Sequence, residues 1–443
     1  MQQSPVRPLN RSDQKMKKTL VTALTISALG LTTTAFAGYP KTERNNAHHQ
    51  RIAKKHKAAE QYHYLKDQKK KSETPLSQQP LFGLSSKLFI TAISADRYPL
   101  AYLLNDDPGR VLFGVGGEMD LQQTFGSSFD VTPAGANQSG TTSSARLHTG
   151  SSILRLGIVS AMAKINDWVR LAGVLEMPGN EPIFTNALID FGNLKRSPWY
   201  VAAGNTRVDF GYFEGNSTLT NTLFNQIYRT GYDNSQVTLG YYNSHISNTT
   251  TVYQPGTSYK GQRLDVQFAD LLVLRQNFTK SLNGLFNIGY INDLRGTGNG
   301  FTSSVNDFSQ NTSRTNALTL GTSWTYKHLT GFLIYNSTLK RQQITNNHLM
   351  NGITFGGNYV FPLYGKNTNF MIDYTHMNNA QHIQSGSNAL GGITNLIGVE
   401  NNLLAAYMIN ITPNFMLTLE YNMDQTYNRK AINTFTLDFL AYL

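Results

Sequence analysis

Cysteine is absent from the 443 residues of this sequence. Its absence excludes disulfide bonds, thiolate zinc sites and cysteine nucleophiles. Charged residues are also scarce, at 15%, where a soluble domain has roughly a quarter. No apolar run of about 18 residues, the length of a transmembrane helix, follows Ala37. Aromatic residues, by contrast, make up 11% of the chain, so the composition departs from that of a soluble globular domain.

The net charge of +11 belongs almost entirely to the N-terminal part of the chain. Up to Gln79 there are 15 lysines and arginines and 5 acidic residues, a net charge of +10. The remaining 23 basic and 22 acidic residues leave a net charge of +1. The body of the protein is therefore nearly neutral, and its basic pI does not predict a nucleic-acid partner.

The first 37 residues resemble an export signal. The stretch "MKKTLVTALTISALGLTTTAFA" begins at Met16 with two lysines, continues with a moderately apolar middle, and ends in Ala35-Phe36-Ala37. This pattern predicts a secretory signal peptide with Met16 as the initiator. Its apolar run is shorter than the ~20 residues that a membrane-spanning helix needs.

Residues 38–80 are expected to form a basic periplasmic arm, helical or disordered, because apolar residues are too few for a core. His49, His56 and His63 are spaced seven apart, but we favour a polar tether over a metal site and predict no metal. The positive charge suits anionic partners such as lipopolysaccharide or peptidoglycan. Residues 81–109 are expected to form a short inner or periplasmic segment.

From residue 110 onward, apolar and polar residues alternate with a period of two. In "FMLTLEYNM" (415–423), one face carries Phe415, Leu417, Leu419, Tyr421 and Met423, and the other Met416, Thr418, Glu420 and Asn422. One face is apolar and aromatic and the other small and polar, which is the reverse of a sandwich core. The pattern predicts an all-β transmembrane barrel, antiparallel and up-and-down, spanning residues 110–443.

Short and long connections alternate along this region, which predicts about 16 strands with both termini on the short-turn side. The sixth strand, Phe224–Tyr232, has the poorest alternation. In this interpretation 233–235 is a short turn and 244–260 a long loop.

Charges inside the alternation should face the lumen, because a charge at the lipid midplane costs ~2–4 kcal/mol. The candidate pore-lining or ligand-binding residues are Arg155, Arg170, Asp190, Asp265, Asp373 and Glu420. The alternative for each is an ion pair that holds the wall together. A barrel of about 16 strands leaves an aqueous passage, and inward charges set its selectivity. No G-x-S-x-G or H-E-x-x-H motif occurs, so we predict neither an enzyme nor a cofactor.

The stretch "FGNLKRSPWYVAAGNTRVDFGYF" (191–213) resembles a strand–turn–strand segment of the LbtU-type siderophore porins, the legiobactin-receptor family of Gram-negative outer membranes. The matching positions are Phe191, Gly192, Asn193, Leu194, Ser197, Pro198, Tyr200, Ala203, Gly204, Phe210, Gly211 and Phe213. The resemblance implies a barrel of about 16 strands that takes up an iron–siderophore complex without a large plug domain. We expect a periplasmic turn at 192–198, with Trp199 and Tyr200 in an interfacial aromatic girdle.

Two other functions remain open, both in the outer membrane. One is a general or nutrient porin, and the other a structural barrel whose basic arm holds the cell wall. The expected partners are a small-molecule ligand, outer-membrane lipid and lipopolysaccharide. The apolar-alternating C-terminal strand "TFTLDFLAYL" also suits recognition by the barrel-assembly machinery, although it ends in Leu443 rather than an aromatic residue.

Overall fold

The computed structural model describes residues 82–84, 110–126, 129–133, 143–145, 148–177, 182–211, 223–231, 234–256, 265–295, 297, 301, 314–385 and 394–443. The expected signal peptide (1–37) and basic arm (38–80) lie outside these residues. Of the segment 81–109, only the short strand β1 (Phe82–Leu84) is described.

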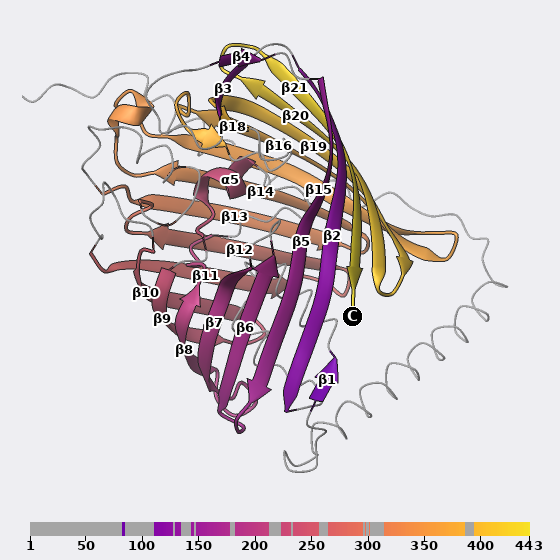
Figure 1. Cartoon of the computed structure of the whole chain (residues 1–443). Coiled ribbons are helices and arrows are strands. Elements are labelled where there is room, and N and C mark those ends of the chain that lie inside the picture. The colour runs from indigo at the N-terminus through magenta and orange to yellow at the C-terminus, as the bar shows by residue number, and fades with distance from the viewer. Residues whose placement is uncertain are drawn as a thin grey trace, which may run out of the picture. The chain divides into compact units, whose positions relative to one another are not determined.

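Sixteen strands form a closed antiparallel ring, as the alternation predicts, and β1 is a seventeenth strand attached to it (Figure 1). The ring closes because β2 pairs with β21 on one side and with β5 on the other. Its strands are β2 (Val111–Gly126), β5 (His148–Lys164), β6 (Val169–Met177), β7 (Ile183–Gly192), β8 (Trp199–Thr206), β9 (Asn234–Tyr242), β10 (Ile246–Gln254), β11 (Gln267–Asn277), β12 (Leu282–Ile291), β13 (Ala317–Tyr326), β14 (Leu329–Thr338), β15 (Asn351–Leu363), β16 (Lys366–Asn378), β19 (Val399–Thr412), β20 (Phe415–Thr426) and β21 (Ala431–Tyr442).

The two ends of the barrel differ in their connections. Tight turns such as 327–328, 364–365 and 413–414 join strands at what we call the short-turn end. The chain enters β2 and leaves β21 at this same end, where Val115 and Leu443 exchange backbone hydrogen bonds. β1 runs parallel to the first residues of β2, so it also lies here. The opposite end, the long-connection end, carries the longer loops.

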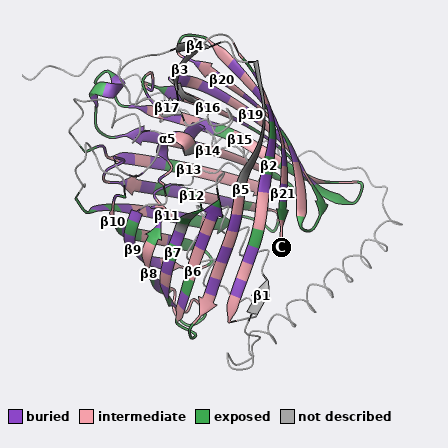
Figure 2. Ribbon diagram, in the orientation of Figure 1, coloured by how far each residue is buried: buried purple, intermediate pink, exposed green. Residues whose placement is uncertain are grey.

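The two faces of the wall have opposite character, and buried and more exposed residues alternate along the strands (Figure 2). Exposed outer positions hold apolar and aromatic side chains such as Leu239, Ile288 and Ile372. Trp324 stacks on Phe278 with ring centroids 5.2 Å apart near the short-turn end. An apolar outer face of this kind is what lipid requires of a barrel. None of the described helices has the length and apolar character to cross a membrane.

Two expectations about individual strands are wrong. One expected strand is absent and one unexpected strand is present, so the total of sixteen is unchanged. Residues 223–228 form a helix, α5 (Leu223–Tyr228), where a sixth strand was expected. The expected loop 244–260 contains strand β10, and the tight turn before it is at 243–245 rather than 233–235. β10 resembles a loop in sequence because most of its residues are Ser, Asn and Thr. Its pairing with β9 and β11 supplies the order that its composition does not.

The stretch that resembles the siderophore porins is a structural landmark at the short-turn end. Asn193 shapes the turn: its backbone oxygen accepts hydrogen bonds from the amides of Arg196 and Ser197, both at 2.9 Å. Trp199 faces outward and contacts Tyr241 edge-on at 4.9 Å, as expected for a girdle. Tyr200 differs from the expectation, because it is buried on the inner face and its ring lies over Gly240.

A second, small sheet bridges two long connections. It joins β3 (Phe129–Pro133) and β4 (Ser143–Ala145), from the β2–β5 connection, to β17 (Gln384–Ser385) and β18 (Thr394–Ile397), from the β16–β19 connection. The link between the two connections is the antiparallel pairing of β18 with β3. These two connections come from strands on either side of the β20–β21 hairpin, so the small sheet ties the loops together around that hairpin.

Candidate functional site

Four of the six candidate residues lie on the inner face of the ring and are buried. They are Arg170 on β6, Asp190 on β7, Asp373 on β16 and Glu420 on β20. Their part in pore lining or ligand binding stays a prediction.

The other two candidates differ. Arg155 has its backbone in β5 beside an irregularity, where Leu156 pairs with Glu118 and Leu154 with Met119. Its side chain is outside the described part. Asp265 is not in the wall: it precedes β11, its side chain is 86% exposed, and it pairs with Arg314 at 3.4 Å. The prediction of a lumen position is wrong for Asp265, because β11 begins only at Gln267 and Asp265 lies in the connection before it.

Two arginines, Arg170 and Arg275, lie on the inner face of the wall, on β6 and β11. Arg170 stands directly opposite Asp190 on the neighbouring strand, and its charge acts on the Asp190 carboxyl. Farther round the ring, Arg275 on β11 lies over the ring of Tyr242 at 5.2 Å. Its Nη2 also donates a hydrogen bond to Ser247 Oγ at 3.1 Å. These arginines are held by the wall itself.

Negative charge gathers on the inner face of β2, β20 and β21, and we did not predict most of it. Glu118 and Asp120 on β2 and Asp438 on β21 are buried, with carboxyl oxygens within 4.8 Å of one another. Glu420 lies on the adjacent strand β20. The signal was available, because the same period of two places Met119 outward between Glu118 and Asp120. Carboxylates gathered on neighbouring strands attract cations to this side of the lumen.

A hydrogen-bonded polar group continues this acidic side toward the long-connection end. Asn402 Nδ2 donates to Asn422 Oδ1 at 2.6 Å and to Asp424 Oδ1 at 2.8 Å. Asn422 Nδ2 donates to Asp424 Oδ2 at 3.1 Å. Both Asp424 oxygens therefore have partners, as a buried carboxylate needs. Asp373, which is 1% exposed, differs: neither of its oxygens has a hydrogen-bond partner among the described residues.

Neither Asp190 nor Asp373 has a hydrogen-bond partner for its carboxyl oxygens among the described residues, but Asp190 stands opposite buried Arg170. This difference predicts opposite outcomes for the same substitution. Asp373→Asn should leave the free energy of unfolding unchanged or raise it, because a buried carboxylate without partners is itself costly. Asp190→Asn should lower it by about 3 kcal/mol, because it removes the negative charge opposite buried Arg170. Urea unfolding in lipid vesicles, followed by tryptophan fluorescence, measures both. An equal loss in the two variants would mean that Asp373 has a charged partner.

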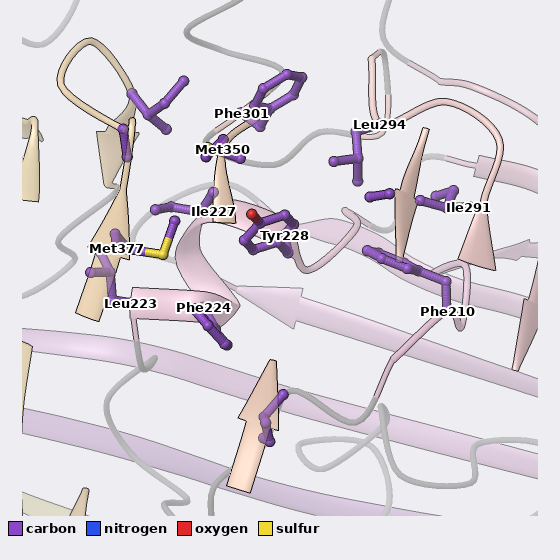
Figure 3. Packing of buried hydrophobic residues seen from close by; sticks show 14 of the residues in the cluster. Phe210, Leu223, Phe224, Ile227, Tyr228, Ile291, Leu294, Phe301, Met350 and Met377 are labelled. Carbon is purple, nitrogen blue, oxygen red and sulfur yellow. The ribbon is translucent and has the colours of Figure 1, made fainter. Parts of the chain in front are cut away.

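The largest feature of the interior is apolar, and the sequence did not reveal it. At the long-connection end, an inner apolar cluster gathers α5, several connections, and side chains from eight wall strands, β10 to β14, β16, β19 and β21 (Figure 3). Its buried members are Val208, Phe210, Leu223, Phe224, Ile227, Tyr228, Tyr253, Ala269, Ile291, Leu294, Phe301, Ala317, Ile334, Ile344, Met350, Met377, Ala380, Ile383, Val399 and Ile432.

Tyr228 and Tyr427 are among the tyrosines that bring polar atoms into this cluster, and both remain neutral there. Burial raises the pKa of Tyr228 well above its ordinary value. Burial also raises the pKa of Tyr427, to about 12, so its phenol keeps its proton at neutral pH. Tyr427 Oη donates to the Met377 carbonyl at 2.6 Å and accepts from the Ala380 amide at 3.1 Å. Tyr427 therefore fixes the chain that follows β16 against the cluster.

The sequence matches no curated protein. Solved structures with a similar arrangement include OprB of Pseudomonas putida, with a TM-score of 0.48, 10% identity, and coverage of 74% of this chain and 94% of that one. Another is the outer membrane channel DcaP of Acinetobacter baumannii, with a TM-score of 0.47, 9% identity, and coverage of 75% and 97%. A third is OccK7 (OpdD) of Pseudomonas aeruginosa, with a TM-score of 0.43, 11% identity, and coverage of 76% and 99%.

A family model described as "Protein of unknown function (DUF3573)" matches residues 78–322, which is more than half of the sequence. The chain belongs to the DUF3573 family.

Proposed function

We propose that this chain is an outer-membrane channel through which a small ligand enters a Gram-negative cell. The observation that carries the proposal is the closed ring of sixteen strands with an apolar outer face and a charged, polar inner face. A closed ring pairs every backbone polar group that lipid would leave unsatisfied. A ring of about this size also encloses more space than its own side chains fill.

We propose further that the ligand is an iron–siderophore complex. This proposal depends on the resemblance of residues 191–213 to the siderophore porins. Within that stretch, Asn193 and Gly204 shape a turn and a close strand contact. The stretch therefore supports a shared barrel construction, and ligand contacts are expected elsewhere. The inner charges of Arg170, Asp190, Asp373 and Glu420 are the proposed contacts.

Uptake of radiolabelled ferric siderophore by cells with and without the protein tests this ligand. We expect uptake to fall at least tenfold on deletion and to return with the intact gene. Unchanged iron uptake together with permeation of sugars or salts through the purified protein would favour a general porin instead. A third outcome would favour the structural barrel whose basic arm holds the cell wall: cells without the protein keep both iron uptake and solute permeation but have a weakened cell envelope.

The location is tested separately, by membrane fractionation and heat-dependent gel migration. An outer-membrane barrel runs faster unheated than heated, because its closed ring resists detergent. Recovery in the soluble periplasmic fraction would contradict the location and with it the channel.

A further inference from the structure

We infer that the channel is closed at its long-connection end by the inner apolar cluster, and that α5 must leave the lumen before hydrated solutes can pass. This inference depends on the proposed channel function. It adds that the channel is gated and does not stand open. The elements that would move are residues 207–211 and 223–231, which belong to the connection between β8 and β9.

The side chains at the centre of the cluster are inaccessible to solvent. Phe210, Phe224 and Tyr228 each have 0% exposure, and Ile227 has 1%. Figure 3 shows Phe224, Ile227 and Tyr228 of α5 among Met350, Met377 and Leu294. These three come from the β14–β15 connection, from β16 and from the β12–β13 connection. Apolar constrictions of this kind exclude water and therefore ions and polar solutes. The polar inner faces of β2, β20 and β21 thus lead toward an apolar barrier.

Two glycines of the wall leave room for close contact with this connection. A Cβ atom built on Gly289 of β12 would overlap the backbone oxygen of Phe210, so the connection passes directly over that glycine. A Cβ on Gly352 of β15 would lie 2.7 Å from Cε1 of Phe224. Both glycines are on the inner face of strands remote in the ring from β8, where the connection starts. The described residues 207–211 and 223–228 therefore reach across the lumen to these strands.

Hydrogen bonds hold the crossing segment in shape. The Val208 amide donates to Thr230 Oγ1 at 2.8 Å, and Thr230 Oγ1 lies 3.0 Å from the Val208 carbonyl. These contacts tie the two ends of the connection together across 22 residues. The Gly231 amide donates to the Thr297 carbonyl in the β12–β13 connection at 2.5 Å. Opening would therefore break the Gly231–Thr297 bond, while the Val208–Thr230 contacts keep the two ends of the connection together.

Movement of this segment would leave the wall intact. The pairings of β8 with β7 and β9, and of β9 with β10, do not use residues 207–211 or 223–231. α5 contains six residues and rests on the wall chiefly through side-chain packing. The ring can thus keep the hydrogen bonds between its strands while the cluster opens, as a gate requires.

Single-channel recording in planar lipid bilayers with potassium chloride tests the gate from both sides of the contact. Ile227→Asp places a charge of α5 inside the cluster. Gly289→Ala adds a Cβ atom to the wall where the backbone of Phe210 now lies. We expect each to raise the time-averaged current at least tenfold over the unmodified protein. The matched controls are Gln226→Asp, at a half-buried position of the same helix, and Gly331→Ala, where the nearest atom to a new Cβ is 3.9 Å away. Both controls should behave as the unmodified protein does.

Heat-dependent migration confirms that each variant is a closed barrel before it is recorded, and either variant alone suffices if the other does not fold. A steady current through the unmodified protein, as large as that of the variants, would overturn the gate and leave the channel function standing. Absence of current in every folded variant would overturn both the gate and the channel.

Discussion

Replacing Leu419 by arginine should lower the free energy of unfolding in lipid vesicles by about 2–4 kcal/mol, the cost of a basic side chain on the lipid face of a barrel near the midplane. Leu419 lies in the middle of β20, points outward, and is 55% exposed. The inward neighbours Thr418 and Glu420 are buried. Urea titration monitored by tryptophan fluorescence gives the free energy.

The matched control is Asn414→Arg, in the tight turn 413–414 that joins β19 to β20. Asn414 is exposed beyond the strand ends, so its substitution should change the free energy by less than about 0.5 kcal/mol. If the two variants lose equal stability, the outer face of β20 is not in contact with lipid.

The second large effect is expected at Gly204. Its φ of +146° is strained for any residue with a side chain. A Cβ there would also overlap the backbone oxygen of Ala187 on β7. Gly204→Ala should therefore force β7 and β8 apart and lower the free energy of unfolding by about 3 kcal/mol. Because only six residue pairs join these strands, much of the unheated protein should lose its fast-migrating form.

Gly331→Ala is the control for this substitution as well. Gly331 lies on β14, has ordinary backbone angles, and has room for a Cβ. The free energy of unfolding of Gly331→Ala should stay within about 1 kcal/mol of that of the unmodified protein. A wild-type stability for Gly204→Ala would falsify the close contact between β7 and β8.

The barrel could be predicted because its physical requirement repeats in every strand. Lipid demands an apolar residue at every second position, as in 415–423, so an error in one strand does not disturb the others. The errors arose where that demand is weak. β10 carries Asn248 and Thr250 on its outer face, and this polar composition resembles a loop. Leu223–Tyr228 is apolar because it packs inside the ring, where a period of two has no meaning.

The site was predictable to a lesser extent. Arg170 and Asp190 stood out because each is a charge between apolar neighbours. The acidic group of Glu118, Asp120 and Asp438 obeys the same rule, but only the closure of the ring brings β2 beside β21. The inner apolar cluster had no sequence signal at all. Its members, such as Tyr253 and Ile334, are single apolar residues on different strands, and only the three-dimensional ring assembles them.

The pairing of β2 with β21 also bears on how quickly this chain can fold. Thr124 and Thr434 approach to 3.2 Å between their hydroxyl oxygens, although 310 residues separate them in the sequence. Contacts of such high sequence separation slow folding, because the entropy of closing a long loop is lost before the contacts form. Until that last seam forms, β2 and β21 are unpaired edges able to join the strands of another chain. Closure of this seam, rather than strength in any single hairpin, is therefore the step that ends the exposure of these edges to other chains.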